Sequence, residues 1–289
     1  MAQIDMTTPL ASDAPAKAPS MFASLLLLAL TIASASSMRS VFSPLQDTVA
    51  TDLNFSDFQI SLIQGLAASI PIAILAIPVG RMTDRGNRTR LLFGLALLWT
   101  IGTVATVFAV DFWQVFFARM LAGVGAFCSL TVAISMAADM SAPEQRGRSL
   151  LMLSLGNMIG LACAFAIGGA LLGYFANAAP LLPGLAPWRS VHLAFAGASL
   201  VLTLLLLLLP EPARREVGDA SASVSAALRA LWARRGLLGP LFLGQVTVVM
   251  ADAAAGIWAA PVLTRHYNLQ PEQFGGWMGL VLLGSGLIG

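Results

Sequence analysis

Residues 80–90 read Gly80-Arg81-Met82-Thr83-Asp84-Arg85-Gly86-Asn87-Arg88-Thr89-Arg90. This short segment carries four of the 16 basic residues of the chain, and apolar runs over 58–80 and 90–110 flank it. Each run has the roughly 20 residues that an α-helix needs to cross ~30 Å of hydrocarbon. The pattern therefore predicts two membrane-spanning helices joined by a tight, charged turn.

The composition of the chain agrees with a lipid environment. Of 289 residues, 57% are hydrophobic and 10% are charged, whereas soluble globular proteins have about 25% charged residues. The two cysteines, Cys128 and Cys163, lie inside apolar runs and form no disulfide framework or metal motif. The sequence also has no Walker-type phosphate loop and no nucleophile triad. We therefore expect a membrane protein that is not an enzyme and that binds no cofactor or metal.

Eight apolar segments are candidate membrane spans. They cover residues 21–46, 58–80, 90–110, 113–138, 148–175, 190–210, 237–263 and 273–289. The first resembles a secretory leader, but its apolar character continues past Ala35 and only Lys17 is basic before it, so we expect an uncleaved helix. The predicted fold class is an all-α membrane protein. A complete bundle of six helices covers 21–210, and a second bundle over 237–289 is expected to be truncated in its second helix.

The placement of basic residues predicts the orientation. With the amino terminus in the cytoplasm, twelve of the 16 fall on the cytoplasmic side: Lys17, Arg81, Arg85, Arg88, Arg90, Arg146, Arg148, Arg214, Arg215, Arg229, Arg234 and Arg235. Only Arg189 and Arg265 then lie outside, and two further arginines fall within spans. Because cytoplasmic loops carry an excess of Lys and Arg, we expect a multi-pass protein of a bacterial inner membrane with a cytoplasmic amino terminus.

Two polar segments border the predicted bundles. Residues 1–20 are polar and rich in Ala and Pro, so we expect a disordered cytoplasmic tail there. Residues 211–236 form the longest internal loop, in which apolar residues recur at helical spacing between Val224 and Trp232. With basic residues beside them, they predict a short helix on the membrane surface, within a linker between the two bundles.

A weak internal repeat supports two related bundles. Asn54-Phe55-Ser56-Asp57-Phe58-Gln59 leads into the second span, and Asn268-Leu269-Gln270-Pro271-Glu272-Gln273 leads into the eighth. A proline precedes each segment, Pro44 by ten residues and Pro261 by seven. Repeated halves are common in secondary transporters, so the repeat favours that class.

Residues in the charged turn have readable physical roles. Gly80 permits two helices to approach closely. Asp84 can cap a helix or pair with a guanidinium at the cytoplasmic rim, while Arg85 and Arg88 hold the turn in the cytoplasm. We predict that these residues, with Asp139 at the end of the fourth span, form a conformational-switch loop. The alternative is that the turn is only a topological anchor.

The turn resembles the loop signature of the major facilitator superfamily, which reads Gly, three residues, Asp-Arg, Gly or Asn, and Arg. Arg119-Met120-Leu121-Ala122-Gly123-Val124-Gly125 resembles the arginine-and-glycine motif of its fourth span, and Asp139 with Arg146-Gly147-Arg148 resembles the exit from that span. With Ile77-Pro78 and Asn87, the chain looks most like bacterial spinster-like members. The resemblance implies twelve helices in two halves, alternating access and, usually, proton coupling.

Two positions depart from the spinster-like pattern. Met38 precedes Arg39 where those proteins commonly carry an acidic residue, and Ala126-Phe127 follows Gly125 where they commonly carry Glu. Both of the absent carboxylates are proton-handling candidates in the family. The departures argue against simple proton coupling through these two positions.

Charged residues inside spans are energetically costly and usually face a cavity. Arg39, Arg119 and Asp252 are such residues, and Gln245 lies seven positions before Asp252 on the same helical face. We predict that these four form a substrate or coupling site. The alternatives are that Arg39 extends to the outer interface, that Arg119 forms a structural ion pair or clamps carbonyls, and that Asp252 pairs with a neighbouring helix.

Other polar residues have plainer expected roles. Gln64 is expected to form an interhelical hydrogen bond. His192 and His266 are expected near the outer surface and solvated. The fifth-span glycines Gly156 and Gly160 are expected to pack against neighbouring helices rather than to bind a ligand.

Together these features predict a secondary active transporter of a small organic solute, with protons as the candidate coupling ion. Two intramembrane arginines against one aspartate favour an anionic or amphipathic substrate. We expect a monomer in the lipid bilayer that binds no nucleic acid. The alternative function is a non-transporting membrane sensor or assembly partner with the same fold, and the polar residues predicted near the midplane favour the transporter.

Overall fold

The computed structural model describes residues 20–214 and 224–288, so the tail predicted over 1–20 lies outside it except for Ser20. The described chain is helical and contains no strand. Its helices are α1 (Met21–Ser40), α2 (Phe42–Leu53), α3 (Asp57–Ser61), α4 (Ala67–Arg85), α5 (Arg88–Phe108), α6 (Phe112–Met140), α7 (Arg146–Asn177), α8 (Pro187–Leu205), α9 (Val224–Ala233), α10 (Arg235–Tyr267) and α11 (Pro271–Ile288). Shorter turns are the π-helix η1 (Leu62–Leu66) and the 3₁₀-helices η2 (Pro143–Gln145) and η3 (Leu206–Leu208).

Seven helical segments of the described chain are long and apolar enough to cross a membrane. They are Met21–Leu53, Asp57–Arg85, Arg88–Phe108, Phe112–Met140, Pro143–Asn177, Pro187–Leu208 and Arg235–Tyr267. These correspond to the first seven predicted spans and confirm a multi-pass, all-α membrane protein. The eighth predicted span corresponds to α11, which packs along α7.

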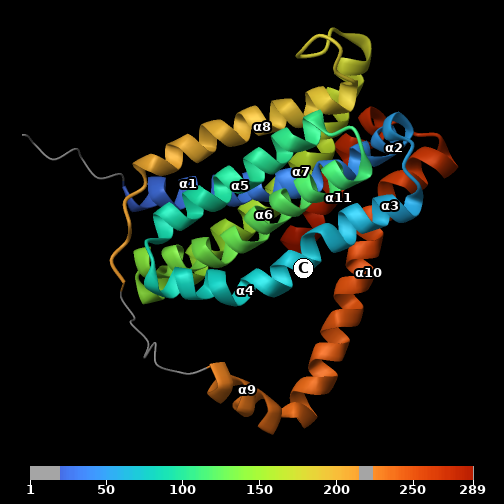
Figure 1. Cartoon of the computed structure of the whole chain (residues 1–289). Coiled ribbons are helices and arrows are strands. Elements are labelled where there is room, and N and C mark those ends of the chain that lie inside the picture. Colours follow the sequence, from blue (N-terminus) through green and yellow to red (C-terminus); the bar gives the residue numbers. More distant parts are fainter. Residues whose placement is uncertain (1–19, 215–223, 289) are drawn as a thin grey trace, which may run out of the picture.

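Helices α1 to α8 lie side by side in one bundle, and α10 meets this bundle near one end and runs away from it at a steep angle (Figure 1). We call the end at which α4 meets α5, near Gly86, the loop end, and the end at which α2 meets α3, near Asn54, the far end. Bulky side chains such as Trp99, Trp188 and Phe42 are fully buried between the bundle helices. Most of α10, in contrast, is exposed, and only Ala260 and Pro261 near its far end are buried.

The first predicted span, 21–46, is longer than expected and is broken. It runs on to Leu53, with a turn at Val41 between α1 and α2. Pro44 causes the break, because proline has no N–H to donate and its ring clashes with the carbonyl four residues earlier. The carbonyl groups near the turn are thereby freed from the helical pattern and need other donors.

Small residues let α7 approach two other helices closely. A Cβ at Gly156 or Gly160 would collide with the carbonyl of Ala29 or Ala33 in α1. Where α7 meets α11, a Cβ at Gly275 would collide with the carbonyl of Phe165. These contacts confirm the predicted packing role of the fifth-span glycines, which resembles small-residue packing in other membrane bundles.

The two segments of the predicted repeat adopt the same backbone conformation. Asn54 ends α2 with φ 54°, and Asn268 ends α10 with φ 55°. They are the non-glycine residues with positive φ in the described chain. The next helix begins in the same manner in both places, since the Gln59 side chain accepts from Ser56 N–H and the Gln273 side chain accepts from Gln270 N–H. The repeat is therefore a repeat of local structure.

Candidate functional site

A buried network at the loop end is centred on Arg88, the first residue of α5. Its side chain is 1% exposed and forms ion pairs with Asp139 of α6 and with Glu211, which follows α8. It also donates to the Pro212 carbonyl at 2.7 Å and to Ser135 Oγ at 3.2 Å. One guanidinium thus joins three helix ends, and hydrogen bonds that involve charged groups are among the stronger ones.

The segment after α8 also binds the turn between α4 and α5. Glu211 accepts from the Thr89 N–H at 2.8 Å, and Arg214 donates to the carbonyls of Thr83 at 2.9 Å, Gly86 at 2.7 Å and Asp84. Burial alone would raise the pKa of the Glu211 carboxyl. The hydrogen bonds from Thr89 and Arg88 outweigh that effect, so its pKa is held below the usual value.

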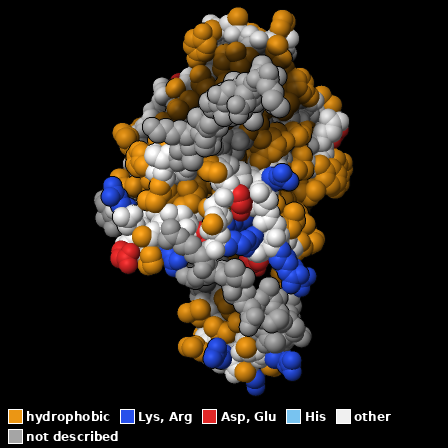
Figure 2. Space-filling view, turned by 90° about the vertical axis from the view of Figure 1, so that its left-hand side faces the viewer, with side chains coloured by type: hydrophobic (Ala, Val, Ile, Leu, Met, Phe, Trp, Pro, Cys, Tyr) orange, Lys and Arg blue, Asp and Glu red, His pale blue; other side chains and the backbone are white. Residues whose placement is uncertain are grey.

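The structure directly pairs two of the predicted switch residues. Arg88 and Asp139 are directly paired, whereas Arg85 and Asp84 are exposed at the surface of the turn. Within the described chain, the Asp84 carboxylate has no basic partner, because Arg214 reaches its backbone carbonyl instead. Figure 2 views the molecule from the loop end, where charged side chains gather in the middle and hydrophobic ones surround them.

The described residues show no close helix approach at Gly80. A Cβ added at Gly80 would meet no atom within 4 Å. Nothing among the described residues packs on that face of α4, so the close approach expected there stays a prediction.

Arg119 is held at the break between α1 and α2. It is 7% exposed and donates to the Met38 carbonyl at 3.0 Å and to the Arg39 carbonyl at 2.5 Å. Its guanidinium also lies 5.1 Å from the centre of the Phe42 ring. This geometry is the carbonyl clamp that the sequence left open as an alternative, and it satisfies carbonyls that the break at Val41 frees.

The Arg39 side chain has different surroundings. Its guanidinium lies 4.7 Å from the centre of the Phe127 ring, and it makes no hydrogen bond or ion pair with the described residues. Asp252 of α10 attracts it electrostatically from beyond salt-bridge distance. Gln245, two turns nearer the start of α10, is exposed, as Asp252 is. The donors of Arg39 are therefore available to a ligand, which those of Arg119 are not.

The far end contains a charged cluster that the sequence analysis did not identify. Arg265 of α10 donates to both carboxylate oxygens of Asp57 at 2.8 Å and to Asp47 Oδ1 at 2.6 Å. One arginine near the end of the seventh span thus ties α10 to α2 and α3. The only signal in the sequence was that an isolated basic residue and two acidic residues border spans at the same predicted membrane face.

A chain of amide groups lies deeper at the same end. Gln46 donates to the Ile257 carbonyl of α10 at 2.6 Å, and Gln64 donates to Gln46. Ser43 donates to Gln64 at 3.2 Å, which confirms the interhelical hydrogen bond expected of that glutamine. Gln64 lies in the π-helical turn η1, and such turns frequently occur at functional sites.

The expectation for His192 is wrong. Its side chain is 0% exposed, with Nδ1 placed 2.9 Å from the Trp188 carbonyl and its ring against Phe42 and Trp188. The residue lies one turn into α8, where that helix is enclosed by the bundle. Closeness to a span end did not imply contact with solvent. His266 is exposed, as expected.

Comparison with known proteins identifies the family. The family model described as Major Facilitator Superfamily matches residues 28–289, so the chain belongs to that superfamily of membrane proteins. It is 29% identical over 225 residues to the 3-(3-hydroxy-phenyl)propionate transporter of Escherichia coli (strain K12), a match that covers 76% of this chain and 51% of that protein. It is 28% identical over 232 residues to protein spinster homolog 1 of Rattus norvegicus, covering 75% and 42%. The chain thus spans about half the length of these relatives.

A solved structure shares the fold. The bacterial homolog of the human lysosomal transporter spinster, in an inward-facing and unoccupied conformation, superposes with a TM-score of 0.81 at 23% identity. The match covers 93% of this chain and 60% of that one. The resemblance to bacterial spinster-like members that the turn at 80–90 indicated is therefore confirmed for the fold.

Proposed function

We propose that this chain carries a small organic solute across the membrane by alternating access, as part of a secondary active transporter. The observation that carries the proposal is the unequal contact of α10 with the six-helix bundle. Arg265 and the Gln46 amide hold α10 to the bundle at the far end. At the loop end α10 diverges from the bundle (Figure 1). A site between two such elements is open to one side only, which alternating access requires.

The inward-facing spinster homolog supplies an orientation for this proposal. In that reading the far end is the closed outer side and the loop end faces the cytoplasm. The basic residues around 80–90 support the same orientation. The protein would then reside in a bacterial inner membrane, as a monomer.

Arg39 supports an anionic or amphipathic substrate. An arginine within a span is costly unless a partner or a ligand compensates its charge. The Arg39 donors have no partner among the described residues, and the Phe127 ring beside them offers an apolar surface. A carboxylate attached to an aromatic or aliphatic body would fit both features. The Escherichia coli relative is named for a substrate of this kind, an aromatic propionate.

Asp252 is the candidate for proton coupling. Met38 and Ala126 occupy the positions at which family members commonly carry carboxylates, and Asp252 is the carboxylate that acts on Arg39. Protonation of Asp252 would remove that attraction and leave the Arg39 charge to a substrate anion. Proton uptake and substrate binding would then be linked through one pair of side chains.

Uptake in proteoliposomes by the purified transporter of which this chain is part tests the proposal, with 3-(3-hydroxyphenyl)propionate as the anionic probe and glucose as a neutral one. We expect anion uptake driven by an imposed pH gradient, and a roughly tenfold or larger loss of anion binding in Arg39→Gln, because a desolvated charge pair loses one partner. Asp252→Asn should keep binding and lose the dependence on pH. Arg148→Gln, which changes an exposed arginine at the loop end, is the control. Absence of uptake of either probe by the folded protein would favour the non-transporting alternative.

A further inference from the structure

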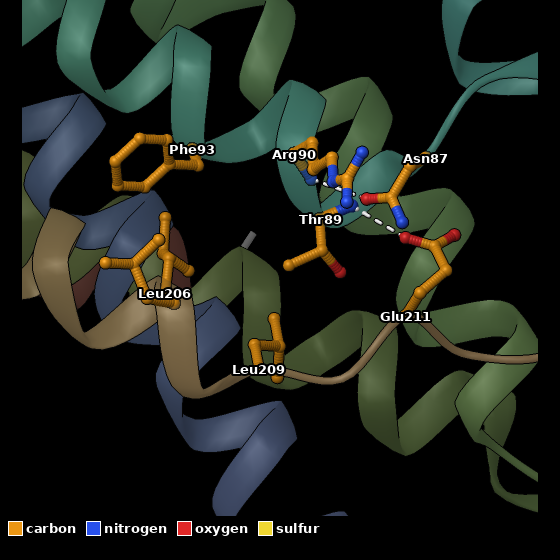
Figure 3. Close-up of a pocket in the computed structure, with 8 residues that line it drawn as sticks. Asn87, Thr89, Arg90, Phe93, Leu206, Leu209 and Glu211 are labelled. Carbon is orange, nitrogen blue, oxygen red and sulfur yellow. Dashed lines mark hydrogen bonds between the residues drawn. The ribbon is translucent and has the colours of Figure 1, made fainter.

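A small cavity at the loop end is not part of the proposed transport route. It has a volume of about 250 Å³ and lies between the start of α5 and the segment that follows α8, from η3 to Glu211. Its lining is divided into an apolar part, made by Phe93, Leu206, Leu207 and Leu209, and a polar part, made by Asn87, Thr89, Arg90 and Glu211. Figure 3 shows the polar residues together on one side and the apolar ones on the other.

The polar part has hydrogen-bonding capacity that the protein does not use. The Thr89 hydroxyl is buried and has no hydrogen-bond partner. The Arg90 guanidinium makes no ion pair with the described residues, since only its backbone N–H is engaged, by Asn87. Glu211 does not neutralise it, because both carboxylate oxygens already accept from Arg88 and Thr89. An unpaired cation beside an unsatisfied hydroxyl suits a ligand with a negatively charged oxygen.

The position of the cavity indicates the origin of that ligand. Its polar part lies where the charged turn meets the first residues of α5, and most of its apolar part lies in and just after η3, the turn that follows α8. The cavity therefore straddles the boundary between the charged loop and the apolar span. Leu207 of this lining and its neighbour Leu208 are 64% and 70% exposed, and they continue the apolar surface of the cavity along η3. A soluble anion would use the arginine and the hydroxyl but not this surface.

We propose that this cavity binds an anionic phospholipid of the cytoplasmic leaflet. The headgroup phosphate would accept from Arg90 and Thr89, and the first carbons of the acyl chains would lie against Phe93 and Leu206. Basic side chains at the membrane surface attract such lipids. A lipid bound here would also contact Glu211, which belongs to the network that joins α5, α6 and the segment after α8 through Arg88 and Asp139.

Native mass spectrometry of the purified protein with added dioleoyl phosphatidylglycerol or dioleoyl phosphatidylcholine tests the proposal. The unaltered protein should retain more phosphatidylglycerol than phosphatidylcholine. Arg90→Gln should weaken phosphatidylglycerol binding about fivefold, the effect of one basic side chain near the surface. Arg148→Gln removes the same charge from the same end outside the cavity and should have no such effect. Thr89→Val should weaken binding, while Thr89→Ser, which keeps the hydroxyl, should not.

Three results would overturn the proposal. If Arg90→Gln and Arg148→Gln weakened phosphatidylglycerol binding equally, the lipid would be attracted by the overall charge of the surface and not by the cavity. Displacement of phosphatidylglycerol by millimolar inorganic phosphate would show a site for a soluble anion. Equal retention of the two lipids by the unaltered protein would exclude selection of an anionic headgroup, and this last measurement needs no variant.

Discussion

The guanidinium of Arg119 donates a hydrogen bond to the backbone carbonyl of Arg39, 2.5 Å away. Two arginines that the sequence assigned to one site are therefore adjacent but have different partners. The Arg119 guanidinium donates to backbone carbonyls of the neighbouring span. The Arg39 guanidinium instead lies over the Phe127 ring and is attracted electrostatically by Asp252.

This difference predicts that Arg119 is needed for folding and Arg39 for ligand binding. Arg119→Gln should lower the free energy of unfolding by ~1–3 kcal/mol, because two carbonyls lose a charged donor. Arg39→Gln should change the free energy of unfolding by less than ~0.5 kcal/mol but weaken the binding of an organic anion. Thermal unfolding followed by intrinsic fluorescence measures the first effect, and calorimetric titration the second. Equal destabilisation by both substitutions would contradict the assignment.

Two glycines with the same expected role should respond oppositely to alanine. A Cβ at Gly160 would overlap the Ala33 backbone, so Gly160→Ala should force α1 and α7 apart and destabilise by ~1–3 kcal/mol. A Cβ at Gly80 meets nothing within 4 Å, and alanine has the higher helix propensity by ~1 kcal/mol, so Gly80→Ala should be neutral or stabilising. Thermal unfolding of the matched pair in one detergent checks this. A large loss of stability in Gly80→Ala would restore the close-packing role.

The loop network should make stability depend on pH in a known direction. The folded-state pKa of Glu211 is depressed, so its contribution is present above the unfolded pKa of about 4.3 and is lost as pH falls through the folded value. Lowering the pH from 7 to 4 should therefore destabilise the wild type more than Glu211→Gln, which has no such carboxylate. Because other acidic groups titrate in both proteins, the quantity to measure is the difference between the two unfolding temperatures at each pH. If this difference in unfolding temperature did not change with pH, the Glu211 carboxylate would make no contribution to the pH dependence of stability.

The sequence was sufficient for features that rest on local chemistry. Span length and composition predicted the bundle, and the matching segments at Asn54 and Asn268 predicted a repeat, which the structure shows as matching helix ends. The sequence was insufficient where the role of a residue depends on which other helices pack against it. Gly80 has the pattern of a packing glycine, but no helix of the described residues lies against it. His192 lies near the end of a span, but the bundle encloses its side chain.

The same limit applied to the candidate site. Intramembrane charge identified Arg39, Arg119 and Asp252, because burying a charge is costly wherever it occurs. The same criterion did not select Arg265, because a charge at the end of a span is not buried in the membrane and its position costs little free energy. The importance of that residue lies in its two acidic partners, which are about 210 residues away in sequence, and no local pattern joins them.

Cysteine labelling tests the proposed orientation. Gly147 at the loop end is exposed with open space around it, and Leu182, between α7 and α8 at the opposite end, is 43% exposed. In a background lacking Cys128 and Cys163, a membrane-impermeant maleimide should label Leu182→Cys in intact cells. It should label Gly147→Cys only after permeabilisation. The reverse pattern would invert the topology and place the Arg88 network outside the cell.

The cluster at Arg265 should hold the far end closed. Exposed ion pairs contribute ~0.2–1 kcal/mol each, and Arg265 binds Asp57 through two nitrogens and Asp47 as well. Its loss should therefore shift the equilibrium between closed and open far ends about fivefold toward the open state. Spin labels at Leu182 and Tyr267, with their distance distribution measured by pulsed electron resonance, report that opening.

A matched set of variants makes this last prediction specific. Arg265→Gln and Asp57→Asn should each increase the population at longer distances. The double variant should add little to either single change, because both remove the same pair. Asp111→Asn, at the start of α6, removes one acidic charge from the same end but keeps a side-chain oxygen that can cap the helix. It should leave the distribution unchanged. If Asp111→Asn opens the far end as much as Asp57→Asn does, then overall surface charge, and not the Arg265 cluster, governs closure.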